Sequence, residues 1–179
     1  MARISPFDPV GPFTAALYRE AADTGLVPEL YAHRGLDGGG DLQLMEWLLP
    51  VPVNEAVGFL QMIATEKPEV AALVRALRNI HNQAQKRLPW CGPLDDNPHN
   101  VMRTRAGRLV LTDPFYADGP NLYKAAAATP DLVAAKIPKA QRRFMTEIPL
   151  AGSGGWDQTI RERIREGLEA ADAALDRRY

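Results

Sequence analysis

The sequence predicts an α+β domain in which helices outweigh strands, and two patterns carry this prediction. Apolar residues recur every three or four positions in several segments, which is typical of amphipathic helices. Two pairs of short apolar runs are separated by glycine-containing turns, which is typical of β-hairpins. The 179 residues are 46% hydrophobic and 24% charged, enough to bury a core without disulfides or metals. We therefore expect one domain over 1–179, with parts 1–49, 50–155 and 156–179.

The first part is expected to contain one helix and one hairpin. Proline and glycine in residues 1–11 predict an irregular lead-in. Pro12 then opens a helix that runs to about residue 24. Two strands, 27–33 and 42–47, are joined by a glycine-rich turn, for which we expect a flexible loop rather than a phosphate-binding one, because no helix follows it.

The rest of the chain has its own order of segments. They are a helix over 54–65 capped by Asn54, a longer helix over 68–88, a polar loop over 90–100, a hairpin over 101–112 that turns at Gly107, a stretch over 114–155 with a helix or two, and an amphipathic helix over 156–175. Asp157 near the start of this last helix suits the helix dipole, and Trp156 is expected to pack against the body.

Charge and cysteine content narrow the classes of partner. The 21 Lys and Arg residues against 22 Asp and Glu residues leave a net charge of -1, so we expect neither nucleic acid nor a membrane surface as partner. The single Cys91 fits a reducing compartment, and no apolar run is long enough for a membrane span or a signal peptide. We expect a cytoplasmic protein.

The loop and hairpin near the middle of the chain present three oxygen-bearing side chains. Asp95 precedes Asn100 by five residues, and Asp113 follows Asn100 by thirteen, with the predicted hairpin between them. Phosphoryl transfer uses a carboxylate to orient an attacking hydroxyl and oxygen ligands to hold magnesium. Asp95, Asn100 and Asp113 are the residue types that this chemistry needs. Asp96 is a competitor for the role of Asp95, although the spacing favours Asp95.

These residues carry a family resemblance. The run Leu94-Asp95-Asp96-Asn97-Pro98-His99-Asn100-Val101-Met102, followed by the hairpin and Thr112-Asp113-Pro114-Phe115, resembles the protein-kinase-like superfamily. Within it, the chain looks most like the early serine/threonine kinases of short-tailed lytic phages. The resemblance spans about residues 13–118. It implies a mainly helical C-terminal lobe, a reduced N-terminal lobe of one helix plus a hairpin, and a second small hairpin at the catalytic loop.

The resemblance also implies roles for individual residues. Asp95 would be catalytic and would orient the acceptor hydroxyl. The implied magnesium ligands are Asn100 and Asp113, and the implied cofactors are ATP and Mg²⁺. The nucleotide-binding residues would be Glu20, as the helix glutamate that pairs with a strand lysine, together with Glu46, Trp47 and Leu48, whose backbone would receive adenine.

The chain departs from that family at its N-terminal end. Its first lysine is Lys67, and no glycine-rich phosphate loop precedes Phe13. Arg3 is the only basic residue early enough to replace the strand lysine, and we expect it to fray with the terminus. Pro114 stands where many kinases have phenylalanine.

Three hypotheses follow from this pattern. The chain is a minimal kinase that phosphorylates a protein hydroxyl; or it is an inactive, pseudokinase-like phage or prophage protein that binds and inhibits a host protein; or it is a small-molecule kinase of the aminoglycoside or choline type. In the first two, the partner is a protein.

Overall fold

The computed structural model describes residues 1–148, 150 and 157–177. The α-helices of this part are α1 (Gly11–Glu20), α2 (Val53–Ala64), α3 (Ala71–Arg87), α4 (Gly119–Ala128), α5 (Pro130–Lys136) and α6 (Gln158–Asp176). Its strands are β1 (Ala2–Ser5), β2 (Leu30–Leu36), β3 (Gly40–Met45), β4 (Leu48–Pro50), β5 (Val101–Thr104) and β6 (Leu109–Leu111). The predicted α+β class is therefore confirmed for the described residues.

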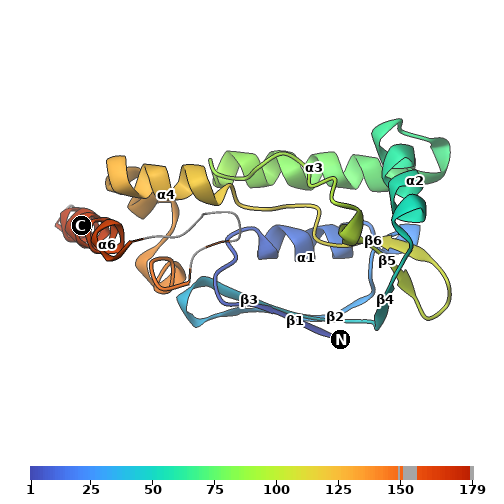
Figure 1. The fold of residues 1–179 in the computed structure, drawn as a ribbon, viewed down its shortest axis with the longest axis horizontal. Coiled ribbons are helices and arrows are strands. Elements are labelled where there is room, and N and C mark those ends of the chain that lie inside the picture. Colours follow the sequence, from blue (N-terminus) through green and yellow to red (C-terminus); the bar gives the residue numbers. More distant parts are fainter. Residues whose placement is uncertain (149, 151–156, 178–179) are drawn as a thin grey trace.

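The first sheet carries helix α1 on one face. Its strand order is β1-β3-β2, and both pairings are antiparallel. In the register, Arg3 of β1 and His33 of β2 both lie opposite Gln43 of β3. Helix α1 lies between this sheet and the long helix α3 (Figure 1). Because side chains alternate along a strand, every second residue of the sheet points toward α1.

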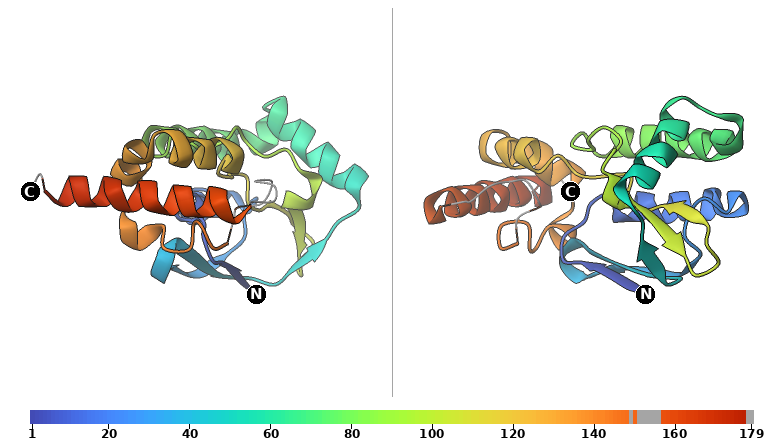
Figure 2. Two further views of the ribbon diagram at one scale, coloured as in Figure 1. Left: turned by 60° about the vertical axis from the view of Figure 1, so that its left-hand side comes forward. Right: turned by 45° about the vertical axis from the view of Figure 1, so that its right-hand side comes forward.

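The second sheet lies at the far end of α3. It has the order β4-β5-β6, again antiparallel, with Leu48 opposite Thr104 and Val101 opposite Leu111. Helix α2 packs beside β5, and the hairpin of β5 and β6 extends away from the helices (Figure 2). The hairpin turns at Gly107, whose φ of 86° is the left-handed conformation that glycine adopts without strain.

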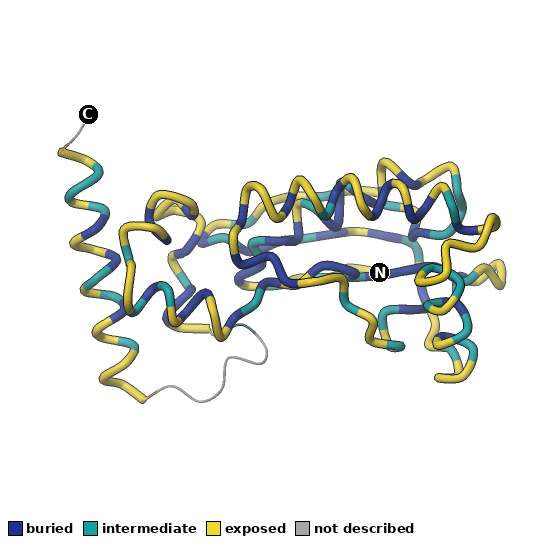
Figure 3. Tube along the Cα trace, turned by 90° about the horizontal axis from the view of Figure 1, so that it is seen from above, coloured by how far each residue is buried: buried dark blue, intermediate teal, exposed yellow. Residues whose placement is uncertain are grey.

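Helix α3 supplies much of the apolar core, which runs along the length of the molecule (Figure 3). The predicted apolar stripe of this helix is confirmed, because its buried residues are Leu73, Val74, Ala76, Leu77, Ile80 and Ala84. The helix ends where Pro89 follows, since proline restricts the residue before it.

The C-terminal part packs at the other end of α3. Two helices, α4 and α5, lie in the stretch that predicted a helix or two, and α6 packs on both. The Asp157 side chain accepts a hydrogen bond from the Ile160 backbone at 2.8 Å and so caps α6. Trp156 lies outside the described residues. None of the helices in the described part of the chain combines the length and apolar character needed to cross a membrane.

Two expectations for the N-terminal part are wrong. Residues 2–5 form strand β1 rather than an irregular lead-in, because they pair with β3 from forty residues downstream. The glycine-rich turn is closely packed rather than flexible. A Cβ on Gly39 would lie 1.7 Å from the Gln141 carbonyl oxygen, and one on Gly38 would lie 2.3 Å from the Phe144 ring. The glycines there permit a close approach of two segments.

Candidate functional site

Asn100 joins the two carboxylate-bearing segments that the sequence singled out. Its Nδ2 donates to Asp95 Oδ2 at 2.9 Å and to the Asp113 backbone carbonyl at 3.1 Å. Its own carbonyl accepts hydrogen bonds from the backbone and the hydroxyl of Thr112. The three predicted residues Asp95, Asn100 and Asp113 therefore lie together, although they come from a loop, a short turn and the end of β6.

A ladder of backbone contacts holds the Asp95 loop in place. The Asp95 N–H donates to the Pro114 carbonyl at 2.9 Å, and the Gly92 N–H donates to the Tyr116 carbonyl at 3.0 Å. Cys91 and Ala117 form an isolated antiparallel bridge in the same ladder. From α3, His81 Nε2 lies 2.8 Å from the Gly92 carbonyl oxygen. The loop before Asp95 is thus fixed by the segment that follows Asp113.

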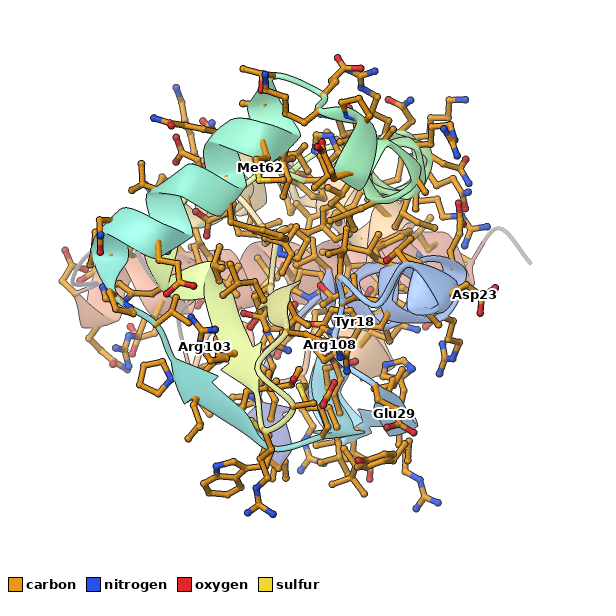
Figure 4. All side chains as sticks on the ribbon, turned by 90° about the vertical axis from the view of Figure 1, so that its right-hand side faces the viewer. Tyr18, Asp23, Glu29, Met62, Arg103 and Arg108 are labelled. Atoms are coloured by element: carbon orange, nitrogen blue, oxygen red, sulfur yellow. The ribbon has the colours of Figure 1, made fainter. Side chains whose placement is uncertain are left out.

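Asp113 has an unusual backbone conformation. Its φ is 43°, in the left-handed region that residues other than glycine seldom adopt, and its N–H donates to the Tyr18 hydroxyl at 3.2 Å. Such a conformation costs on the order of 1 kcal/mol and persists only where the surroundings impose it. Tyr18 is buried on α1 in the centre of the molecule (Figure 4). Helix α1 thereby holds the backbone of Asp113.

The site also contains a cation, Arg3, that was not predicted from the sequence. Arg3 of β1 donates from Nε to Asp113 Oδ2 at 2.7 Å and from Nη2 to Asp8 Oδ2 at 2.8 Å. Its Nη1 lies 3.8 Å from Asp41 Oδ1. The expectation that Arg3 frays with the terminus is therefore wrong, because pairing of β1 with β3 fixes it. The segment around Arg3 carries no clear signal of this, because Ile4 is the only strongly apolar residue of β1.

The pKa values of this group reflect burial and close charge. Burial alone would lower the pKa of Arg3, but the charges of Asp113 and Asp8 outweigh that effect and raise it, so the guanidinium stays charged. Burial raises the pKa of Asp113, while Arg3 acts in the opposite direction. Burial, with the charge of Asp113, also raises the pKa of Tyr18. The Tyr18 hydroxyl is therefore neutral.

Polar side chains continue along the inner face of the first sheet. Asp41 Oδ2 lies 2.6 Å from His33 Nε2, and Asp41 Oδ1 accepts from Gln43 Nε2 at 2.7 Å. Asp41 and Gln43 are both fully buried. At the start of α1, Asp8 Oδ1 accepts hydrogen bonds from the backbone N–H groups of Val10 at 3.1 Å and Gly11 at 2.8 Å. The face between the sheet and α1 is thus charged where an apolar core is usual.

Glu20 lies away from this cation. Its Oε1 accepts a hydrogen bond from Asn79 of α3 at 2.8 Å, and the side chain is exposed. The carboxylate near α1 that pairs with Arg3 is therefore Asp8 rather than Glu20.

The predicted adenine-binding segment connects the two sheets. The Glu46 N–H donates to the Glu29 carbonyl, and its carboxylate pairs with Arg108 of the second hairpin at 3.2 Å. Trp47 is 53% exposed, with the Arg105 guanidinium 5.9 Å from its ring centroid. Leu48 is buried and pairs with β5. Arg105 and Arg108, near the turn between β5 and β6, therefore contact the segment that contains Glu46 and Trp47. Arg108 is labelled in Figure 4.

A cavity of about 830 Å³ opens beside Asp95. Its walls combine residues from β1 and the segment that joins β1 to α1 with the Asp95 loop and the segment after Asp113. The lining residues are Arg3, Ser5, Pro6, Phe7, Asp8, Val10, Pro93, Leu94, Asp95, Asp96, Phe115, Tyr116, Ala117, Ile148 and Leu150. Its volume lies in the range of small-molecule sites. The residues of the predicted adenine-binding segment are not in this lining.

The fit of a magnesium ion rests on an orphaned oxygen. Asp113 Oδ1 is a buried atom without a hydrogen-bond partner, although Oδ2 is held by Arg3. Asn100 uses its Nδ2 for both bonds described above, which leaves its oxygen for a ligand. Among the described residues, no group of three acidic, histidine or cysteine side chains could hold a metal alone. Mg²⁺ commonly takes one or two protein oxygens and completes its shell with phosphate and water, which suits this donor set.

The chain matches no protein-family model and no curated protein. The residues of the site are therefore the basis for assigning a function.

Proposed function

We propose that the chain is a protein-kinase-like phosphotransferase that moves a phosphoryl group from ATP to a hydroxyl. The single observation that carries this proposal is the pair of hydrogen bonds from Asn100 to Asp95 and to the Asp113 carbonyl. These bonds support a shared role for three residues: Asp95 as the carboxylate that orients the hydroxyl, and Asn100 and Asp113 as the magnesium ligands. The β1-β3-β2 order, with Arg3 on its outer strand, supports the proposal further, because it supplies the strand cation that the sequence lacks as a lysine.

Each residue of the site has a distinct task in this reaction. Asp95 accepts hydrogen bonds from the Asn97 N–H and from Asn100, and it lines the cavity. These bonds fix its carboxylate so that a free lone pair can orient the acceptor hydroxyl. The hydroxyl oxygen forms a bond to the γ-phosphorus as the bond to ADP breaks, and the hydroxyl proton passes to Asp95.

Asn100 and Asp113 would hold magnesium, which neutralises charge on the phosphates when it is bound. Arg3 supplies a positive charge next to Asp113. The adenine-binding role of Glu46, Trp47 and Leu48 stays a prediction, as does the choice between a protein hydroxyl and a small alcohol as acceptor.

Calorimetry of the full chain with ATP and magnesium tests nucleotide use. Binding should be present in the wild type, lost in Asp113→Asn and retained in Asp131→Asn, which removes an exposed carboxylate on α5. Circular dichroism checks that each variant folds. The absence of binding in the wild type at any concentration would refute nucleotide use. Labelled ATP, offered with protein and with amino alcohols, identifies the acceptor class.

A second candidate is the pseudokinase-like binder, and the outer face of the first sheet favours it. Ile4 of β1 is 65% exposed and Leu44 of β3 is 40% exposed, both on the face opposite α1. Exposed apolar groups on one face are typical of interaction surfaces. Affinity capture from a cell lysate discriminates the two candidates. A partner that is retained by Asp95→Ala/Asp113→Ala and lost with Leu44→Ser supports the binder; one lost with both refutes it.

A further inference from the structure

The guanidinium of Arg3 is surrounded by more negative charge than it can neutralise. Asp8 and Asp113 lie at hydrogen-bond distance from it, and Asp41 lies 3.8 Å away. Three carboxylates therefore share one permanent cation. The second oxygen of Asp41 is bound to His33 rather than to another arginine or lysine.

The contact between Arg3 and Asp113 occupies the carboxylate that a metal ion would use. Oδ2 of Asp113 holds Arg3 Nε at 2.7 Å, and only the buried Oδ1 lacks a partner. A divalent cation at Oδ1 would face the positive guanidinium across a single carboxylate. The metal ion and the guanidinium would then lie only a few ångströms apart, and two positive charges that close in a protein repel each other strongly. Metal binding and the Arg3 contact therefore oppose each other.

Arg3 also has two other carboxylates with which it can pair, Asp8 and Asp41. Its Nη2 already bonds the buried Asp8, and its Nη1 is a buried atom without a hydrogen-bond partner that lies near Asp41. The Arg3 side chain is 26% exposed and lines the cavity. It can therefore release Asp113 and keep two carboxylates as neighbours.

We propose that Arg3 is a built-in counter-cation that competes with a divalent metal ion for Asp113. In the metal-free chain the guanidinium holds Asp113 to the N-terminal strand. When a metal ion binds Asp113, Arg3 shifts toward Asp8 and Asp41, so metal binding and the contact of β1 with the Asp113 segment are coupled. This inference rests on the magnesium-binding role of Asp113 within the proposed function, and it concerns the regulation of the same site.

Manganese titration of the full chain, followed by electron paramagnetic resonance, tests the competition without nucleotide or acceptor. Arg3→Gln should bind Mn²⁺ at least ten-fold more tightly than the wild type. Adding Asp113→Asn to Arg3→Gln should remove that gain. The matched control is Arg34→Gln, which removes an exposed arginine from β2 of the same sheet and should leave Mn²⁺ affinity unchanged.

Two results would overturn the proposal. Equal or weaker Mn²⁺ binding by Arg3→Gln excludes competition, and a gain that survives Asp113→Asn assigns the metal to Asp8 and Asp41 instead. If Arg3→Gln does not fold, Arg3→Lys replaces it, because one ammonium keeps the charge but lacks the fork that bonds two carboxylates at once. Tighter binding is expected there too, and unchanged binding rejects the competition.

A measurement on the wild type needs no variant. The Arg3 Nε–H resonance should shift when saturating Mg²⁺ is added, because its bond to Asp113 is lost. Mg²⁺ binding that leaves this resonance unchanged contradicts the proposal. Because neither readout requires phosphoryl transfer, a chain that fails to use ATP can still show the competition, and an active kinase can still fail to show it.

Discussion

Replacement of Asn100 by alanine tests whether its amide joins the two halves of the site. The substitution removes one hydrogen bond to the Asp95 carboxylate and one to the Asp113 backbone carbonyl. A bond to a charged group contributes about 1.5–3 kcal/mol and a neutral one about 1 kcal/mol. Because the site is half-buried, water replaces part of this, and we expect Asn100→Ala to lower the free energy of unfolding by about 2–3 kcal/mol.

Urea unfolding followed by circular dichroism measures this loss. For a domain of this length, it corresponds to a drop in Tm of about 5–10 °C. Asn82→Ala on the exposed side of α3 is the control, and helix propensity predicts little change or a small gain in stability there. If Asn100→Ala costs less than about 0.5 kcal/mol, the amide does not hold Asp95 and Asp113 together, and the proposed site loses its main support.

Three further predictions concern the rest of the molecule. Gly39→Ala should lower the free energy of unfolding by more than about 2 kcal/mol, because the φ of Gly39 is 89° and the added Cβ would meet a backbone carbonyl. In the control Gly35→Ala the added Cβ meets no atom, so this variant should be tolerated. Equal stabilities of the two variants in urea would contradict the close packing. Burial raises the pKa of Tyr123 to about 12. The unfolded chain therefore loses this proton first, and stability should fall by roughly 2–3 kcal/mol as pH rises from about 10 to 12, a slope that Tyr123→Phe should flatten in pH-dependent unfolding. Arg142→Met should lower the free energy of unfolding by about 3–5 kcal/mol, because it leaves the carboxylate of Asp172 unpaired. The double variant Arg142→Met/Asp172→Leu should recover most of that stability. Calorimetric unfolding that shows no recovery would refute the importance of this pair.

The sequence predicted the parts of the fold whose cause is local. The stripe on α3 and the turn at Gly107 each depend on residues within a few positions of one another. The three polar residues around the second hairpin were also predictable, because a hairpin returns the chain to its starting point and so brings Asn100 and Asp113 together. Local pattern is sufficient where the chain closes on itself.

Strand β1 could not be predicted from its own four residues. Ala-Arg-Ile-Ser has only one strongly apolar position, so it shows no readable alternation, and the strand forms because β3 offers an open edge. The position of Arg3 was unpredictable for the same reason, because its pairing with Gln43 of β3 is what holds this terminal residue in place. The tight packing of Gly39 against Gln141 is equally nonlocal, and a run of glycines looks the same in sequence whether it is flexible or enclosed.

The charged inner face of the first sheet is difficult to explain by stability alone. Asp41 is fully buried and Asp8 nearly so, around a single guanidinium. The burial of charged groups carries a desolvation cost that their mutual attraction often fails to recover, and apolar residues of similar size usually serve a core as well or better. The strained backbone of Asp113 adds a second local cost beside them. Both costs fall around Arg3, which contacts Asp113 and also lines the cavity beside Asp95. They therefore point to the region between β1, α1 and the Asp95 loop as the functional part of the molecule.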